Sequence, residues 1–376
     1  MVKLGKRETE PIIKELQSQG KQVVSFSRLS TLENCPYEAY LNYIKHKKGE
    51  ENIYSTLGDA FHDKLQEIID GYDTVSGLLI VLEKTLSDLD TLGMEFPKDS
   101  RGGTSIRDSW VADMSHFCRD FVPPKGEFST EDFCLLKVSD DLYLQGYIDL
   151  TQYHSDGSIS LWDWKTSSNY KKSDLLSHGR QLVLYAMAKE QEGFKVNHTG
   201  WIMLKYVEIS FLGKARSNVK QNTMITKVVN RGKIVKELRP YLKANMLDNG
   251  MGDLEAELML DVATEKNDLS LLPPEVVEKY TIKPYVRRYD LTDELRKEAL
   301  NFVTEKSAEF AERGNQKENY PPRNFWKWGR GGKHIEDTFY DNCLCGYSKV
   351  CEYIQDHNIK RLAQSAGEDD ELSELF

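Results

Sequence analysis

Apolar positions recur with helical spacing in the first third of the chain. In residues 54–71 they fall three and four residues apart, and His62 lies beside them, which predicts an amphipathic helix. Residues 72–125 predict a helical insert that is interrupted around residues 97–103 by proline and glycine. The apolar residues on the common face of the first helix are Leu57, Phe61, Leu65 and Ile68.

The period changes to two in the middle of the chain. Residues 142–149 alternate between apolar and polar, residues 154–157 favour a turn, and residues 158–165 alternate again. This pattern predicts a β-hairpin. The order strand, strand, helix, strand predicts an α/β core. The elements expected after the hairpin are a helix at residues 177–192, a strand at residues 200–206 and a further candidate strand at residues 207–212.

The last quarter of the chain contains a predicted helix and an acidic run. Residues 292–313 predict a helix, because Asp293 and Glu294 suit its first turn and Gly314 its end. Residues 367–376 are an acidic run that ends in Phe376, and they are expected to be disordered. This run resembles the acidic, phenylalanine-terminated tips of bacterial single-strand-binding proteins, so it is either a site for a protein partner or a solubilising tail.

Composition limits the class of protein. With 376 residues and a hydrophobic fraction of 39%, the chain can bury a large core in one elaborated domain or two. The formal net charge of -10 argues against a uniformly basic nucleic-acid binder, although local charge matters more for such binding. No apolar run is long enough to cross a membrane, and residues 1–20 are too charged for a signal peptide. A cytoplasmic location without a membrane partner is therefore expected.

The hairpin carries the most informative chemistry, namely Asp149 on its first strand and Asp163-Trp-Lys165 on its second. Asp163 and Lys165 are two residues apart and must point to one face of the strand. Paired carboxylates suit Mg²⁺ or Mn²⁺, and a nearby lysine can orient the attacking water in phosphodiester hydrolysis. The tripeptide alone is weak evidence, because it occurs by chance about once in such a chain and is usually a solvated strand edge.

Flanking motifs strengthen this interpretation. In their order and spacing they resemble RecB-type nucleases of the PD-(D/E)xK superfamily, and they are most similar to the iron-sulfur branch with AddB nuclease domains and CRISPR-associated RecB-like exonucleases. The resemblance covers residues 25–70, 140–206 and 290–355. The motifs are Ser27-Arg-Leu-Ser30 followed by Cys35-Pro36, Gly58-Asp-Ala-Phe-His62, Gly146-Tyr-Ile-Asp149, Asp163-Trp-Lys165-Thr166 and Gln181-Leu-Val-Leu-Tyr185.

The resemblance implies a fold and a set of site residues. The fold is α/β, with a restriction-endonuclease-like core in which helices flank a mixed central sheet, and an iron-sulfur site joins the helical N- and C-terminal parts. Lys165 would be the catalytic lysine. Gln181 and Tyr185, four residues apart on one helix face, would help to hold the active centre and DNA. The implied metal ligands are His62, Asp149, Asp163 and the backbone carbonyl of Trp164. Taken singly, His62 would more often be a packed helix residue, and Gln181 with Tyr185 a half-buried polar pair.

The resemblance also implies a [4Fe-4S] cluster. Its ligands would be Cys35, Cys343, Cys345 and Cys351. The family separates the first two of its three C-terminal cysteines by two residues, whereas a single residue lies between Cys343 and Cys345, so Cys343 departs from the pattern. A tetrahedral zinc site is the alternative for the same thiols. Cys118 and Cys134 are expected to be packing residues.

Two basic segments are candidate DNA-binding surfaces. Residues 214–243 carry nine Lys and Arg against the single acid Glu237 and could lie over the active site. Residues 323–330 mix cations with aromatic residues, which suits contact with a strand and its bases. For any one of these cations a solvated face is an equal alternative. Residues 329–334 lack a complete phosphate-loop motif, so no nucleotide cofactor is expected. The candidates are Arg216, Lys220, Arg231, Lys233, Arg323, Trp326, Lys327 and Trp328.

The expected organisation is one nuclease domain with additions. The expected function is Mg²⁺- or Mn²⁺-dependent hydrolysis of DNA, as an exonuclease on single-stranded ends in recombination, repair or phage DNA metabolism. The alternative is a catalytically weak or inactive nuclease-fold subunit for DNA binding or assembly. The segments are an N-terminal extension (1–24), a RecB-like nuclease domain (25–355) with a helical insert (72–125) and a basic insert (209–285), and an acidic tail (356–376).

Overall fold

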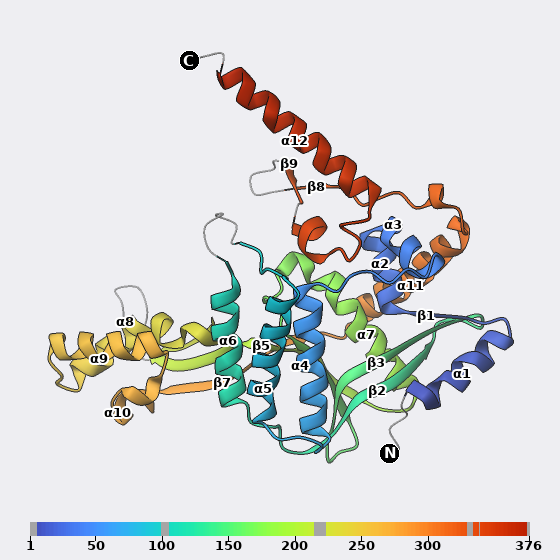
Figure 1. The fold of residues 1–376 in the computed structure, drawn as a ribbon. Coiled ribbons are helices and arrows are strands. Elements are labelled where there is room, and N and C mark those ends of the chain that lie inside the picture. The colour runs from blue at the N-terminus through green and yellow to red at the C-terminus, as the bar shows by residue number, and fades with distance from the viewer. Residues whose placement is uncertain (1–5, 99–104, 214–222, 329–333, 338, 374–376) are drawn as a thin grey trace.

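A seven-stranded mixed sheet forms the centre of the part of the chain that the computed structural model describes, residues 6–98, 105–213, 223–328, 334–337 and 339–373 (Figure 1). Two strand pairs, β1 with β3 and β4 with β5, are parallel, and the other pairs are antiparallel. The expected mixed α/β core is thereby confirmed. The strands are β1 (Gln22–Ser25), β2 (Glu127–Lys137), β3 (Leu142–Tyr153), β4 (Ile159–Lys165), β5 (Val196–Gly213), β6 (Thr223–Asn230) and β7 (Tyr280–Tyr289).

The predicted hairpin is present as β3 and β4. Their pairing runs from Tyr153 opposite Ile159 to Leu150 opposite Trp162. Gly157 in the connecting turn has a φ of 80°, which glycine adopts without a steric penalty. Strand β2, the long antiparallel neighbour of β3, was not predicted, because its residues do not alternate regularly between buried and exposed.

The prediction of two strands in residues 200–212 was wrong, because β5 is one continuous strand of 18 residues. Its first half pairs with β4 and its second half with β6, while β7 accompanies both halves. The pairing with β7 shifts register between Ile202 and Val207. The outer half of the strand therefore extends beyond β4 and forms part of a second apolar core.

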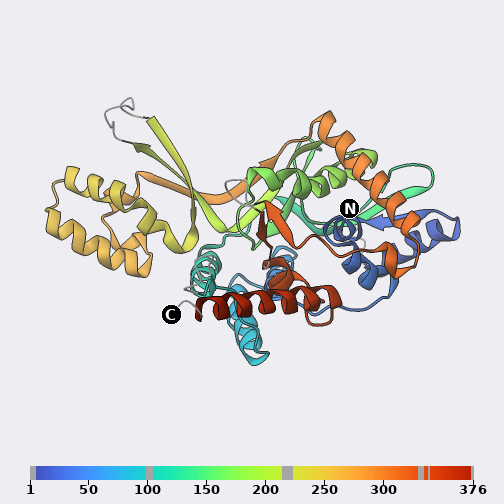
Figure 2. The same cartoon turned by 90° about the horizontal axis from the view of Figure 1, so that it is seen from above.

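Three helices cover one face of the sheet: α4 (Ile53–Ile69), α5 (Gly77–Thr91) and α6 (Arg107–Asp120) (Figures 1 and 2). They confirm the predicted helix at residues 54–71 and the helical insert after it. The apolar face predicted for the first helix is fully or nearly fully buried. Asn52 caps α4 by accepting hydrogen bonds from the Tyr54 and Ser55 amides, and Ser55 returns a hydrogen bond to the cap.

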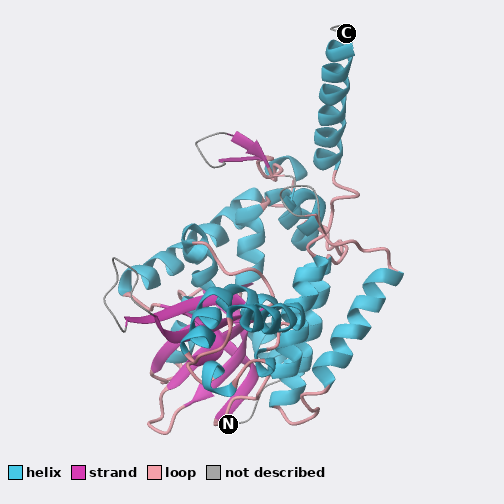
Figure 3. Ribbon diagram, turned by 90° about the vertical axis from the view of Figure 1, so that its left-hand side faces the viewer, coloured by secondary structure: helices cyan, strands magenta, loops and turns pink. Residues whose placement is uncertain are grey.

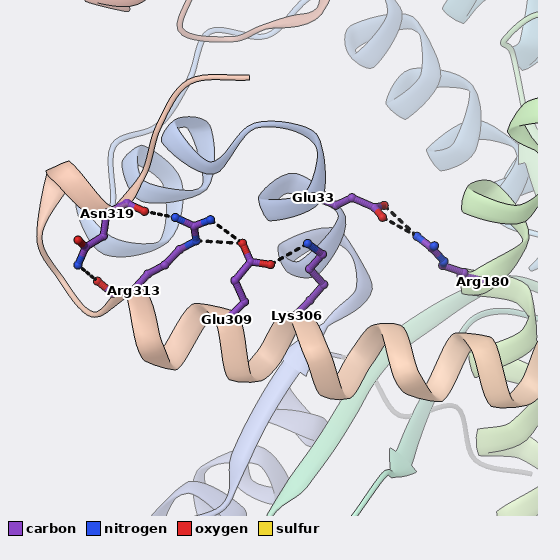
Figure 4. Close-up of polar contacts among 6 residues, drawn as sticks. All are labelled: Glu33, Arg180, Lys306, Glu309, Arg313 and Asn319. Atoms are coloured by element: carbon purple, nitrogen blue, oxygen red, sulfur yellow. Dashed lines mark hydrogen bonds and ion pairs between the residues drawn. The ribbon is translucent and has the colours of Figure 1, made fainter. Parts of the chain in front are cut away.

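The opposite face is covered by α7 (Leu175–Gln191) and α11 (Asp293–Arg313), both near their predicted positions. Arg180 on α7 donates hydrogen bonds to Glu33 on α2 (Phe26–Asn34) at 2.9 Å and to Glu298 on α11 at 2.8 Å. Figure 4 shows the contact with Glu33 beside a second network on α11, in which Glu309 pairs with Lys306 and Arg313. The two ion pairs of Arg180 fix α7 against α2 and α11.

The N- and C-terminal parts meet above the sheet. The Glu50 amide donates to the Gly346 carbonyl at 2.7 Å, and the Tyr347 hydroxyl donates to the Lys47 carbonyl at 2.6 Å. The Tyr37 amide donates to Pro321 O at 3.1 Å. Segments some three hundred residues apart are thus joined by ordinary hydrogen bonds. The small elements here are α3 (Pro36–Ala39), η1 (Tyr40–Ile44), η5 (Lys317–Asn319), β8 (Trp326–Trp328), β9 (His334–Glu336) and η6 (Tyr340–Leu344).

The basic insert forms a lobe of its own, which we call the lobe (residues 207–213 and 223–283). The outer half of β5, together with β6, β7 and three helices, encloses a separate apolar core. The lobe projects to one side of the sheet in Figures 1 and 2, so the placement of the insert over the active site is not what the described residues show. Its helices are α8 (Ile234–Asp248), α9 (Asp253–Lys266) and α10 (Pro274–Val277), with the short turns η3 (Arg231–Lys233) and η4 (Leu269–Leu271).

The two ends of the described chain are helical. Helix α1 (Lys6–Ser18) precedes β1, and α12 (Glu352–Ser373) stands off the body (Figures 1 and 3). The expected disorder from residue 367 onward was therefore wrong as far as Ser373. Phe376 lies outside the described residues, so a partner contact there stays a prediction. Within the described residues, no helix combines the length and the apolarity needed to cross a membrane.

Candidate active site

The candidate site lies where the β3–β4 hairpin opens. The pairing of the two strands ends at Leu150 and Trp162, one residue before Asp149 and Asp163. Beyond that point Asp149 Oδ2 accepts the Trp164 amide at 3.0 Å. Strand β4 remains paired with β5 through Lys165, so the second carboxylate and the lysine are carried by a supported strand.

Asp163 and Lys165 share a face, as the period of two predicted. The Lys165 ammonium donates to Asp163 Oδ1 at 2.9 Å and lies 2.7 Å from Oδ2. The Asp163 side chain is only 13% exposed, and its Oδ2 has no aligned hydrogen-bond donor. Burial alone would lower the pKa of Lys165, but the neighbouring Asp163 carboxylate raises it above its usual range. Lys165 is therefore a cation at neutral pH.

His62 reaches the same opening from α4. Its Nε2 donates to the Trp164 carbonyl at 2.8 Å, and because a carbonyl oxygen only accepts, Nε2 carries the proton. Burial, helped by Lys165, lowers the pKa of His62 below its usual value, so the ring is neutral. The lone pair of Nδ1 then faces Asp149 Oδ2 at 3.3 Å. Two electron-pair donors this close suit a proton or a cation between them.

Asp149 and Asp163 also act on each other. Burial, and then the neighbouring Asp163 carboxylate, raise the pKa of Asp149 well above its usual range. Two half-buried carboxylates and a carbonyl supply the oxygen ligands that Mg²⁺ and Mn²⁺ prefer, and the neutral imidazole beside them adds a nitrogen ligand. The residues present therefore fit a divalent cation. This fit concerns the kinds of ligand atom. In the described ranges no three His, Cys, Asp or Glu side chains are placed to contact one metal ion, so the side chains would have to move to bind it.

Helix α7 brings Gln181 and Tyr185 to the carboxylate face. Gln181 Nε2 donates to the Tyr185 hydroxyl at 3.1 Å, and both Asp163 and Asp149 act electrostatically on that hydroxyl. A Cβ added at Gly146 on β3 would overlap the Tyr185 ring. Gly146 in the motif before Asp149 thus makes room for the tyrosine.

Three neighbours of the site, Tyr170, Asp59 and His178, were not predicted from the sequence. The Tyr170 phenol acts on both Lys165 and Asp163, and its ring stacks on His178 with centroids 4.1 Å apart. Asp59 lies one helical turn before His62 and interacts with it electrostatically. His178 and Asp59 stand three residues before Gln181 and His62 on the same helices, and this spacing was the available indication. Tyr170 follows the strand in a loop, where no period marks it.

Three of the four candidate cluster cysteines meet in the structure. Cys35, Cys345 and Cys351 line one small pocket with Tyr340 and Ile354 and influence each other's charge. Cys343 is not among the residues that line it, and its thiol acts on Tyr54 instead. Burial raises the pKa of Cys345 to about 12, so the thiols are neutral here. Three of the four candidate cysteines therefore line one pocket and the fourth does not, and within the described residues no three such side chains are arranged as a metal site.

Cys118 and Cys134 are buried in the two sheet cores, in agreement with their predicted packing role.

The candidate DNA-binding residues differ in their surroundings. Arg231 is only 5% exposed, whereas Lys233 is exposed. Arg323 and Lys327 both pair with Asp337, and Trp326 is 49% exposed. Arg216 and Lys220 lie outside the described residues, and of Trp328 only the backbone, in β8, is described. Helix α9 supplies Glu257 and Asp261 to Arg239 and Glu257 to Lys243, so two cations of this basic run are paired within the lobe.

Comparison with known proteins adds one match. The family model described as the PD-(D/E)XK nuclease superfamily matches residues 23–352, a span that includes every candidate site residue above. The search of curated proteins gave no significant match.

Proposed function

The chain belongs to the PD-(D/E)XK nuclease superfamily, whose members are generally nucleases, and from this premise we propose that it is a Mg²⁺- or Mn²⁺-dependent DNA nuclease. The observation that carries the proposal is the meeting of Asp149, Asp163 and Lys165 with His62 at one opening of the sheet. The alternation of β4 and the burial of both carboxylates have no simpler structural reason, because a purely structural strand would bury apolar side chains there.

Each residue has a part in the proposed reaction. His62, Asp149, Asp163 and the Trp164 carbonyl would hold the cation. When bound, the cation supplies Lewis acidity to a phosphoryl oxygen and lowers the pKa of water. Lys165 donates a hydrogen bond to the attacking water and offsets negative charge as it develops on the phosphate. Gln181 and Tyr185 would help to hold the carboxylate face of the site and would hydrogen-bond the DNA strand.

The proposed substrate is a single-stranded DNA end. This rests on the resemblance to exonucleases of the RecB type, and recombination, repair or phage DNA metabolism would be the setting. Linear single strands labelled at one end and closed circles of the same sequence test it. Release of label from the linear strand with intact circles is expected, whereas cutting of circles would show an endonuclease.

Substitution of Lys165 tests the activity itself. Lys165→Ala is expected to lower the rate of cleavage in Mn²⁺ by at least about a hundredfold, because the group that orients the water is lost. Lys172→Ala, a nearby exposed lysine on η2 (Lys172–Asp174), is the matched control and should cleave like the wild type. Equal cleavage by the Lys165 variant and the control would contradict the proposed mechanism.

A second function is a DNA-binding or assembly subunit without useful catalysis. The Lys165 to Asp163 ion pair favours it, because it engages a carboxylate that the cation would need. In the same assay this function requires that neither wild type nor Lys165→Ala cleaves any strand, while both bind DNA equally in chelator.

The [4Fe-4S] cluster remains part of the proposal, with zinc as its competitor. Cys35, Cys345 and Cys351 would hold it, and Cys343 would have to present its thiol to the same pocket. Anaerobic purification followed by iron and zinc analysis tests the site. Cys345→Ser should lose iron while Cys118→Ser keeps it. Stoichiometric zinc in a colourless wild-type protein would replace the cluster with a zinc site.

A further inference from the structure

A second charged pocket lies away from the candidate active site, where the lobe joins the sheet. Its volume is about 720 Å³, which is within the usual range for a ligand site. It is walled by the last turn of α6, the start of η3, the loop between α9 and η4, and strands β5 and β7. None of His62, Asp149, Asp163 and Lys165 lines it.

Cations outnumber acids in this pocket. Arg119, Arg231, Lys266 and Lys283 line it, against Asp120 and Asp268. In the described part of the chain, none of these four cations forms an ion pair. The pKa of Asp268 is lowered mainly by the hydrogen bonds that it accepts from Ser270, and to a smaller extent by the charges of Arg119 and Lys266. The pocket therefore presents positive charge to a ligand.

Arg231 is the least exposed of these cations, at 5%. Its Nε donates to the Leu204 carbonyl at 2.8 Å, and its guanidinium lies 5.4 Å from the centre of the Phe117 ring. Burial lowers the pKa of Arg231 to about 10, although the Asp120 and Asp113 carboxylates act in the opposite direction, so the guanidinium stays charged at neutral pH. Among the described residues no carboxylate forms an ion pair with it. A buried guanidinium without a paired carboxylate at the wall of a cavity can gain a charge-assisted hydrogen bond from an anion that enters the cavity.

The local backbone is built to hold Arg231 in place. Asn267 adopts a left-handed conformation with a φ of 49°. Its side-chain Nδ2 donates to the Arg231 carbonyl at 2.6 Å, and its Oδ1 accepts a hydrogen bond from the Val235 backbone amide at 3.1 Å. From the other side, Asp113 on α6 accepts the Gly232 amide at 2.8 Å. Loop, helix and lobe thus converge on one arginine.

Part of the wall is apolar and is formed by Val207, Ile234, Leu269, Ile282 and Pro284, while the neutral polar side chains of His116, Asn267 and Ser270 complete the lining. Cations beside an apolar wall suit a ligand that has both a phosphate and a less polar body. The geometry points to this pocket, anchored by Arg231, as a binding site for the phosphate of a nucleotide unit, carried either by a nucleic-acid strand or by a free nucleotide. The site is separate from the proposed nuclease centre and does not depend on its activity.

Removal of the exposed cations tests the site without disturbing packing. The probes are a short fluorescent oligodeoxythymidylate, followed by anisotropy in EDTA so that nothing is cleaved, and deoxyadenosine triphosphate, followed by calorimetry. Lys266→Ala/Lys283→Ala is compared with Lys236→Ala/Lys279→Ala, two exposed lysines of the lobe outside the pocket. Arg231→Gln is a second pocket variant, read only if it is folded by circular dichroism.

We expect the pocket variant to bind at least one probe several-fold more weakly than the control. For the oligonucleotide, the slope of log affinity against log salt should fall by about one for each lysine that contacts phosphate. Loss for the oligonucleotide alone identifies a strand, and loss for deoxyadenosine triphosphate alone identifies a free nucleotide. Equal binding of both probes by the pocket variant and the control would overturn the site. Because binding is measured in EDTA, where the proposed nuclease does not cleave, this result is separate from any failure of the nuclease proposal.

Discussion

Trp164 shows how one residue between two charged ones organises the candidate active site. Its indole is 3% exposed and packs in the core beneath α4 and α6. This packing fixes the strand, so that its amide faces Asp149 and its carbonyl faces His62. The arrangement of the site therefore depends on an apolar side chain that is buried in the core.

The space above Gly146 gives a sharp test at the residue scale. Gly146→Ala should destabilise the protein by about 1–3 kcal/mol and lower cleavage, because the new Cβ overlaps the Tyr185 ring. The measurement is urea unfolding together with the Mn²⁺ cleavage assay.

Gly58→Ala is the matched control in the helix that carries His62. Its nearest atom would be Thr166 Oγ1 at 3.8 Å, so alanine fits and should stabilise the helix by about 0.5–1 kcal/mol. If Gly146→Ala were as stable as Gly58→Ala, the assigned position of Tyr185 would be incorrect.

At the scale of the element, α7 decides the geometry of the carboxylate face. One side of the helix carries His178, Gln181 and Tyr185 toward the site. Arg180, between them in sequence, ties the helix to α2 and α11 and lies with its guanidinium 4.2 Å from the centre of the Phe302 ring. A shift of this helix would move every polar group it supplies.

Arg180→Ala should lower the free energy of unfolding by about 1–3 kcal/mol, because the arginine is 13% exposed and its removal leaves two carboxylates without their partner. Arg107→Ala is the control, since Arg107 makes a similar forked contact with Asp90 at an exposed position. It should cost no more than about 1 kcal/mol. Similar losses in denaturant unfolding of both variants would show that Arg180 does not hold α7.

For the whole molecule, β5 is the strand that two cores share. Its inner half lies in the central sheet, and Val207, Ile209 and Phe211 of its outer half lie in the core of the lobe. The lobe has its own fully buried residues, among them Leu238 and Leu242. Regions with separate cores can open separately, because each loses only its own contacts.

Leu238→Ala should remove about 2–5 kcal/mol from the lobe and increase amide hydrogen exchange in its described segments, with little change in α4 and α7. Leu184→Ala, in the core between α7 and the sheet, should give the opposite distribution. Exchange that rises throughout the chain for both variants would mean that the two cores unfold as one.

Sequence alone determined the parts whose pattern is local. Alternation predicted β3 and β4 and placed Asp163 and Lys165 on one face, and helical spacing predicted α4, because period and side-chain direction follow from backbone geometry. The residues at its two ends predicted α11. Tertiary structure alone decided that Asp149 takes the Trp164 amide, that Tyr170 reaches Lys165, and that Cys343 stands apart from Cys35. It also paired Arg239 and Lys243 of the basic run with acids of α9 and buried Arg231 at the wall of a pocket. These contacts join residues distant in sequence, and their partners are fixed only when helices and strands pack.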